Sequence, residues 1–195
     1  MKILAFADHH GSPSDFAEVI RKAKEVDLII CLGDFTIFEN EIEYIMNQID
    51  RLPKKVLLLH GNHEDEDTTR FLSEHSKNIQ FLHEAVFETG KYAFIGYGGG
   101  GFATTDPRFE MVSKKFPEVM KGKKTILLLH GPPYGTKQDL LAIGHVGCKS
   151  FRKFIEEHQP ALVLCGHLHE TFYTKDKIGK SKIINPGPDG QIIDI

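Results

Sequence analysis

The stretch Val56-Leu57-Leu58-Leu59-His60-Gly61-Asn62-His63-Glu64 contains the two signals that decide the fold, a short apolar run and a polar cluster with glycine directly after it. Five apolar runs of strand length, at residues 3–7, 28–32, 56–59, 126–129 and 161–165, end in this way, with Asp, Asn or His beside a glycine. Glycine lets the backbone bend sharply and approach a ligand closely.

Helical segments separate the early runs and indicate an α/β fold. Residues 15–26 and 39–51 carry apolar residues at helical spacing, with Ser14 or Asp15 expected to cap the first helix, and residues 148–157 predict a third helix. Strands alternating with helices favour a parallel sheet covered on its faces. Glycine-containing turns at 90–91 and 178–180 predict two hairpins, the second closed by residues 191–195, so part of the β structure should be antiparallel. No linker divides residues 1–195, which favours one domain.

Composition narrows the function classes. The 195 residues are 41% hydrophobic and 26% charged with a net charge of −3, which excludes a strongly basic nucleic-acid binder. No apolar run is long enough for a membrane span, and the N-terminal apolar run reaches Asp8 too soon for a signal peptide, so a cytoplasmic location is expected. Three cysteines predict no disulfide framework, whereas eleven histidines suggest a metal site with nitrogen and oxygen ligands.

The polar clusters are expected to meet in space. Because the carboxyl ends of parallel strands share one edge of a sheet, ligands bind in the crevice outside that edge. Carboxylate, carboxamide and imidazole ligands without thiolate favour two divalent ions of Mn, Fe, Zn, Ni or Co over Ca or Mg. Among these five metals we take Mn as the expected ion. Each cluster alone has an ordinary structural explanation, such as an Asp-capped turn, but the five together do not. They are Asp8-His9-His10-Gly11, Gly33-Asp34, His60-Gly61-Asn62-His63-Glu64, His130-Gly131 and Gly166-His167-Leu168-His169.

In that order these motifs resemble the calcineurin-like metallophosphoesterase superfamily over residues 8–169. The resemblance implies a four-layer α/β/β/α sandwich of two mixed sheets flanked by helices. It also implies that one ion is held by Asp8, His10 and His169, and the other by Asn62, His130 and His167, with Asp34 bridging both. His63 would face the phosphate without binding metal, and Glu64 would orient the His63 ring.

Such a centre would hydrolyse phosphate esters by attack of a metal-bridging hydroxide, with His63 as proton donor. The loop around residues 131–147 looks like that of a small-phosphodiesterase subgroup, which favours a small or nucleotide-type phosphodiester as substrate. Candidate substrate contacts are Asn62, His63, Tyr97, Gly99, Tyr134 and His145, with Tyr97 or Phe102 available to stack on a base.

Three alternatives stay open at this level: a phosphomonoesterase of the same fold, a non-catalytic protein-binding scaffold, and a repair-type nuclease. Scaffold members of such a family would show erosion of the site, and here every motif position is intact. A nuclease would need a basic track, and the lysine pairs of this chain are scattered. A small phosphate ester is therefore the expected partner, with nucleic acid and membrane disfavoured and the oligomeric state undetermined.

Overall fold

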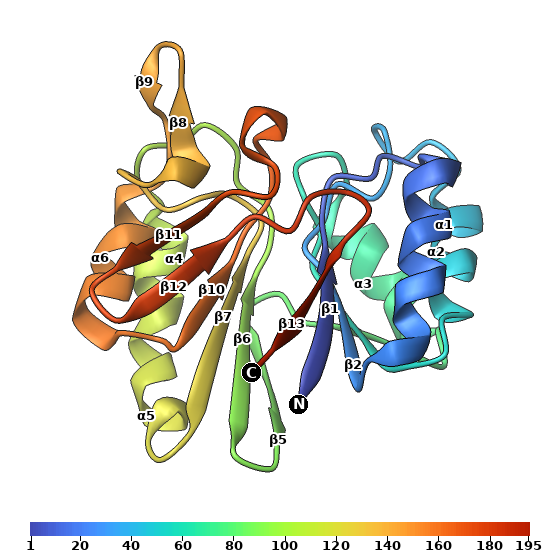
Figure 1. The fold of residues 1–195 in the computed structure, drawn as a ribbon, viewed down its shortest axis with the longest axis horizontal. Coiled ribbons are helices and arrows are strands. Elements are labelled where there is room, and N and C mark those ends of the chain that lie inside the picture. The colour runs from blue at the N-terminus through green and yellow to red at the C-terminus, as the bar shows by residue number, and fades with distance from the viewer.

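The computed structural model describes residues 1–195 and arranges them in four layers, with two sheets packed face to face between helices (Figure 1). The first sheet has the order β13-β1-β2-β3-β4, and all its neighbours are parallel except β13 and β1. Its strands are β1 (Lys2–Phe6), β2 (Leu28–Cys31), β3 (Val56–Leu58), β4 (Ile79–Phe81) and β13 (Gln191–Asp194).

The second sheet has the order β11-β12-β10-β7-β6-β5 and is also mixed. Strands β12, β10, β7 and β6 are parallel, whereas β5 and β11 are antiparallel to their neighbours and form the two predicted hairpins. The strands are β5 (Ala85–Thr89), β6 (Tyr92–Tyr97), β7 (Lys124–Leu129), β10 (Leu162–Leu164), β11 (Lys175–Ile178) and β12 (Ser181–Ile184).

Three helices cover the outer face of each sheet (Figure 1). On the first sheet they are α1 (Pro13–Lys22), α2 (Ile42–Asp50) and α3 (Glu66–Glu74), and on the second α4 (Pro107–Val112), α5 (Phe116–Met120) and α6 (Lys149–His158). Short 3-10 turns occupy Ala23–Glu25, Ser113–Lys115, Lys137–Asp139 and His169–Thr171. A two-stranded finger, β8 (Leu140–Leu141) and β9 (Gly144–His145), projects from the end of the molecule at which the parallel strands finish (Figure 1).

The alternation of side chains along each strand divides the core into three layers. Ile3 and Ala5 of β1 pack between the sheets against residues such as Phe94, whereas Leu4 and Phe6 pack under α1 and α2. A third apolar layer lies between the second sheet and α4–α6. This arrangement confirms the predicted fold class of two mixed sheets flanked by helices.

Three local predictions are wrong. Residues 191–195 do not close the second hairpin, because β13 pairs with β1 in the other sheet, with Ala5 opposite Gln191. The cap of α1 is Ser12, whose hydroxyl accepts from the amide of Asp15, because Pro13 already occupies the first helical turn. Helix α2 begins at Ile42 rather than near residue 39, since Phe38, Glu39 and Glu41 have left-handed backbone angles.

No helix of the structure is both long and apolar enough to cross a lipid bilayer.

Candidate metal centre

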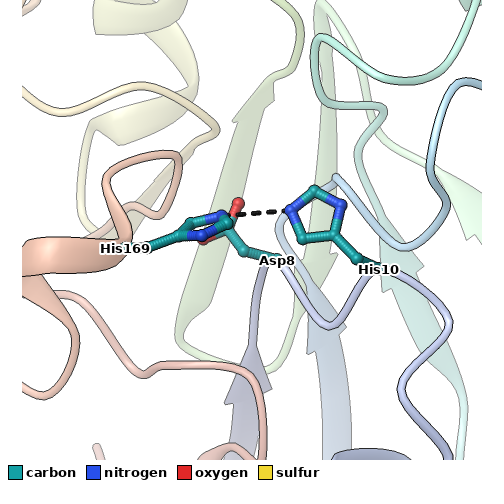
Figure 2. A group of neighbouring side chains, drawn as sticks. All are labelled: Asp8, His10 and His169. Atoms are coloured by element: carbon teal, nitrogen blue, oxygen red, sulfur yellow. Dashed lines mark hydrogen bonds between the residues drawn. The ribbon is translucent and has the colours of Figure 1, made fainter.

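The predicted ligands lie together beyond the ends of β1, β2, β3, β7 and β10. Two sets of three have ligand atoms within 4.8 Å of one another. We call Asp8, His10 and His169 the outer group (Figure 2), and Asp34, His130 and His167 the inner group. A third set, His10, Asp34 and His63, overlaps both groups, so they form one continuous centre.

The backbone at this edge is unusual, because four of the gathered residues have positive φ angles. These are Asp8 (58°), His10 (46°), Asp34 (49°) and His167 (72°). Left-handed conformations of non-glycine residues cost about 1–3 kcal/mol each and cluster at functional sites. The rest of the fold therefore holds these side chains in place at a cost in stability.

Two glycines are required by the close approach of carboxylates. A Cβ on Gly166 would meet Asp8 Oδ2 at 2.6 Å, and a Cβ on Gly61 would overlap Asp34 Oδ1. At these two positions glycine thus provides space for a carboxylate from a neighbouring strand.

The outer group brings two imidazole nitrogens face to face. His10 Nδ1 lies 2.7 Å from the carbonyl oxygen of Thr36 and donates to it, which leaves the lone pair of a neutral ring on Nε2. That Nε2 lies 3.0 Å from Nε2 of His169 (Figure 2). Two nitrogens at this distance need a shared proton or a cation.

Asp8, the carboxylate of the outer group, has no cationic partner of its own. Burial raises its pKa to about 7, and the charge of His130 offsets this only in part. Its oxygens accept the amide of His167 at 2.9 and 3.1 Å.

The inner group is buried and contains a charge pair. His130, 0% exposed, donates from Nδ1 to the carbonyl oxygen of Leu32 at 2.9 Å. Its Nε2 lies 3.0 Å from Asn62 Oδ1 and 3.5 Å from Asp34 Oδ2. Burial opposes protonation of His130, but the hydrogen bond and charge of Asp34 raise its pKa to about 9. Burial acts against ionisation of Asp34, yet His130 and the amide of His63 hold its pKa well below the usual range.

His167 provides the strongest indication that a cation belongs here. Both of its ring nitrogens are buried and have no hydrogen-bond partner, and a buried polar atom without a partner costs about 1–3 kcal/mol. Burial lowers its pKa to about 4, so the ring is neutral and carries the free lone pair that a metal requires. The donor set of imidazole, carboxylate and carboxamide therefore fits two divalent transition ions.

His63 lies at the rim of the centre, half-buried. Its Nε2 lies 4.0 Å from Asp34 Oδ2, and its Nδ1 accepts from the amide of Phe38 at 3.3 Å. A neutral ring held in this way carries its proton on Nε2, on the side that faces the centre.

The carboxylate of Glu64 makes no hydrogen bond to the His63 ring. This buried carboxylate accepts the amides of Asp34, Thr36 and Gly61 at 2.8–2.9 Å and the hydroxyl of Thr36 at 2.7 Å. Glu64 therefore braces the loops after β2 and β3, and the expectation that it orients the catalytic imidazole is replaced by this role.

Two candidate substrate contacts, Tyr97 and Gly99, lie inside the protein. Tyr97 is 3% exposed and its hydroxyl donates to the Asp106 carboxylate at 2.9 Å, so no ring face is free for stacking. Gly99 is buried against His60, and its amide donates to the His60 carbonyl at 2.9 Å instead of pointing at a ligand. Phe102, 65% exposed with its ring 4.8 Å from that of His167, is the accessible aromatic of this segment.

The candidate substrate contacts Tyr134 and His145 lie next to one another. His145 is on the finger, and Tyr134 is in the loop before it. Their ring centroids are 5.7 Å apart, and His145 Nδ1 lies 2.8 Å from the buried carboxylate of Asp139. Asp139 also accepts the amides of Gly135, Thr136 and Gly147, so one side chain fixes the base of the finger.

Sequence reasoning missed Thr36 and Phe38, which both follow Asp34. Thr36 links Glu64 to His10, and Phe38 contacts His63 through its amide and its ring. Their roles depend on backbone conformation, for which the run Phe35-Thr36-Ile37-Phe38 carries no periodic signal.

Comparison with known proteins supports the resemblance seen in the sequence motifs. Residues 1–171 match the family model described as calcineurin-like phosphoesterase. No curated protein sequence matches the chain. Similar solved structures include TT1561 of Thermus thermophilus, with 18% identity and a TM-score of 0.75 over 95% of this chain and 88% of that one.

Two further structures have TM-scores of 0.68. A dimetal phosphatase from Danio rerio is 11% identical over 94% of this chain and 86% of its own. A phosphopantetheinyl hydrolase from Mycobacterium tuberculosis is 12% identical over 95% of this chain and 88% of its own. At such identities the likeness shows the fold alone.

Proposed function

This chain belongs to the calcineurin-like phosphoesterase family, and we propose that it is a dinuclear-metal phosphodiesterase acting on small or nucleotide-type phosphodiesters. One observation carries the proposal: the outer and inner groups lie side by side. They are linked by the third set, which shares His10 with the outer group and Asp34 with the inner group. Five strand ends contribute to this centre, and each contribution is a residue type that binds divalent transition ions.

The outer group with Asp34 would hold one ion, and the inner group with Asn62 the other. Two such ions, with Mn²⁺ favoured over Fe, Zn, Ni or Co, supply Lewis-acid neutralisation of phosphoryl charge and activation of water. Asp34 carries the shared negative charge, and the neutral oxygen of Asn62 keeps the total charge low enough to admit an anion.

His63 would supply the proton that the departing alcohol needs. Its Nε2–H faces the centre while Nδ1 is occupied by the Phe38 amide. Positioned acid catalysis contributes about 10²–10⁴-fold, and we assign this share to His63. Asn62 and His63 would contact the phosphate, and Tyr134 and His145 remain our candidates for the organic part of the substrate.

The lack of cationic side chains bonded to the centre favours a diester over a monoester as substrate. No Lys or Arg side chain hydrogen-bonds or pairs with any residue of the two groups, with Asn62 or with His63. A monoester carries two negative charges near neutral pH and a diester carries one, so a site without extra cations suits the diester better.

The test is a substrate panel with the metal-free protein reloaded with each ion in turn. We expect kcat/KM with Mn²⁺ to be higher for bis-para-nitrophenyl phosphate than for para-nitrophenyl phosphate, and linear and cyclic nucleotide diesters to extend the series. Asp34→Asn should abolish turnover, whereas Asp67→Asn, an exposed carboxylate on α3, should leave it unchanged. A preference for monoesters would establish the alternative phosphomonoesterase, and no hydrolysis with any ion would leave the scaffold function.

A second experiment separates His63 from the metal ligands. His63→Ala should keep its metal content and lose rate in proportion to how poor the leaving group is, reaching about 10²–10⁴-fold with an alkoxide. Equal losses on good and poor leaving groups would make His63 a phosphate-binding residue, and loss of metal would make it a ligand.

A further inference from the structure

Phe38 is an exposed aromatic residue in a conformation that aromatic residues avoid. Its side chain is 76% exposed and its φ is 47°. Exposure of a large apolar ring and a left-handed backbone both cost free energy. Neither cost is offset by core packing, because Phe38 lies outside the three apolar layers.

Phe38 interacts with His63 in two ways, through its ring and through its amide. The two ring centroids are 4.3 Å apart with an interplanar angle of 30°, so the phenyl ring covers one face of the imidazole. The Phe38 amide donates to His63 Nδ1 at 3.3 Å. One residue thus fixes the plane of the imidazole and the position of its proton.

No other group performs this task. The carboxylate of Glu64 is fully engaged with backbone amides and the Thr36 hydroxyl. On its remaining sides His63 meets Asp34, 4.0 Å from Nε2, and the edge of the His10 ring, 4.8 Å between centroids. Both of these belong to the metal centre and lie on the reacting side.

The loop that carries Phe38 is held by hydrogen bonds on both sides of Phe38, at Thr36 and at Glu39. Thr36 is held by Glu64, and its hydroxyl accepts the amide of Glu39 at 3.1 Å. The carboxylate of Glu39 accepts the amide of Asp65 at 3.1 Å. The loop after β2 is therefore clasped to the loop that contains His63, and the left-handed turn at Phe38 is held rather than mobile.

From these contacts we propose that Phe38 is the positioning residue of His63, holding the imidazole with Nε2–H toward the phosphate through its ring and its amide. The proposal rests on the proposed role of His63 as proton donor. It predicts that the Phe38 ring affects the step that needs a proton and leaves metal binding unaffected.

The kinetic test uses Phe38→Gly, because glycine adopts a positive φ without strain and keeps the amide while the ring is removed. With the Mn²⁺-loaded protein we expect kcat for a methyl nitrophenyl-type diester with a good leaving group to change little. For an alkyl leaving group kcat should fall about tenfold, part of the roughly 10²–10⁴-fold available from a positioned acid. KM and metal content should stay near wild type, and Phe38→Tyr should restore the rate.

Phe71→Ala is the matched control. Phe71 is also an exposed phenylalanine, 59% accessible, and its ring lies 4.4 Å from that of His75 at the end of α3, outside the centre. Its loss should leave the leaving-group dependence unchanged. Phe38→Asn, a residue that tolerates the left-handed region, repeats the test if the glycine variant unfolds.

A spectroscopic readout on the metal-free protein is independent of turnover. Nitrogen-15 spectra of the imidazoles, with His63 identified by its loss in His63→Ala, should show the Nε2–H tautomer in the wild type. Without the Phe38 ring the imidazole can turn away from the backbone amide of residue 38, so Phe38→Gly should give a mixture of tautomers, while His75 is unchanged. An unaltered His63 spectrum and leaving-group dependence in Phe38→Gly would overturn the proposal. If no phosphate ester is hydrolysed, the proposed function fails, and the tautomer shift alone decides whether Phe38 positions His63.

Discussion

The outer and inner groups are built from the same two residue types, yet they differ in depth and in charge compensation. In the inner group Asp34 and His130 form a buried pair in which each stabilises the charged form of the other. In the outer group His169 is exposed, and burial leaves Asp8 with a pKa of about 7. The charges of the inner group are therefore balanced without an ion. The outer group has a carboxylate without compensation and an exposed imidazole, so we expect an ion bound there to exchange more readily with solvent.

Asp34→Asn should have the largest effect, because we propose that the Asp34 carboxylate contributes its charge to both ion sites. We expect loss of at least one ion per chain and loss of activity to background, measured by metal analysis and by turnover of a diester. Retention of two ions with unchanged activity would place the bridging role elsewhere.

Two variants, His167→Ala and His169→Ala, test whether the inner and outer groups bind separate ions. Each variant should lose one ion, with an affinity loss above the roughly 10–100-fold typical of outer-shell changes. The ion left in His169→Ala should resist a chelator longer than the ion left in His167→Ala, because the inner group is buried. Identical chelation kinetics in both variants would contradict the difference in depth.

Glu64→Gln should have an intermediate effect that falls on the inner half. A carboxamide has one accepting oxygen and an NH2 group that only donates, so at least one amide of Asp34, Gly61 or Thr36 loses its partner. Loss of such a buried bond costs about 1–3 kcal/mol, which thermal or urea unfolding of the metal-free protein would detect. We expect the affinity of the inner group for its ion to fall more than that of the outer group. Wild-type stability would show that Glu64 does not brace these loops.

The smallest expected effect concerns the number of protons that the protein releases when metal binds. At pH 7 the metal-free protein holds a proton on His130, whose pKa is about 9, and part of one on Asp8, whose pKa is about 7. Both must leave when these groups bind metal. Calorimetry in buffers of different ionisation enthalpy should show release of more than one proton at pH 7. The part of the release that comes from Asp8 and His130 should disappear above the pKa of His130, about 9, and a release that does not fall with pH would contradict these values.

The sequence predicts the centre better than its surroundings. Asp8, Asp34, His130 and His167 each follow an apolar run, and the common edge of parallel strands brings them together whatever the loops do. The same rule specifies neither the backbone angle of each ligand nor the partner of Glu64, because both depend on the path of the loops.

Outside the centre the differences from the sequence predictions have separate causes. In β6 both faces are buried, one under the first sheet and one under α4–α6, so Tyr97 lies in the core although it ends a strand beside a glycine loop. The sequence does not predict helix α3, because Glu66–Glu74 is mostly polar and has few apolar residues at helical spacing. The pairing of β13 depends on which sheet edge remains open, a property of the assembled fold that the local sequence does not contain.

That last pairing has a consequence for how the protein is made. Strand β13 joins Lys2 to Asp194, so β1 waits for its edge partner while all the residues between them are synthesised. At about 5–20 residues per second, this interval lasts roughly 10–40 s. During that time β1, which leads into Asp8, has an unpaired edge that can join another chain. Contacts of such high sequence separation also slow folding. We therefore expect the strand that carries Asp8 to be fully paired only once β13 has been made, and removal of β13 to increase aggregation of the newly made protein.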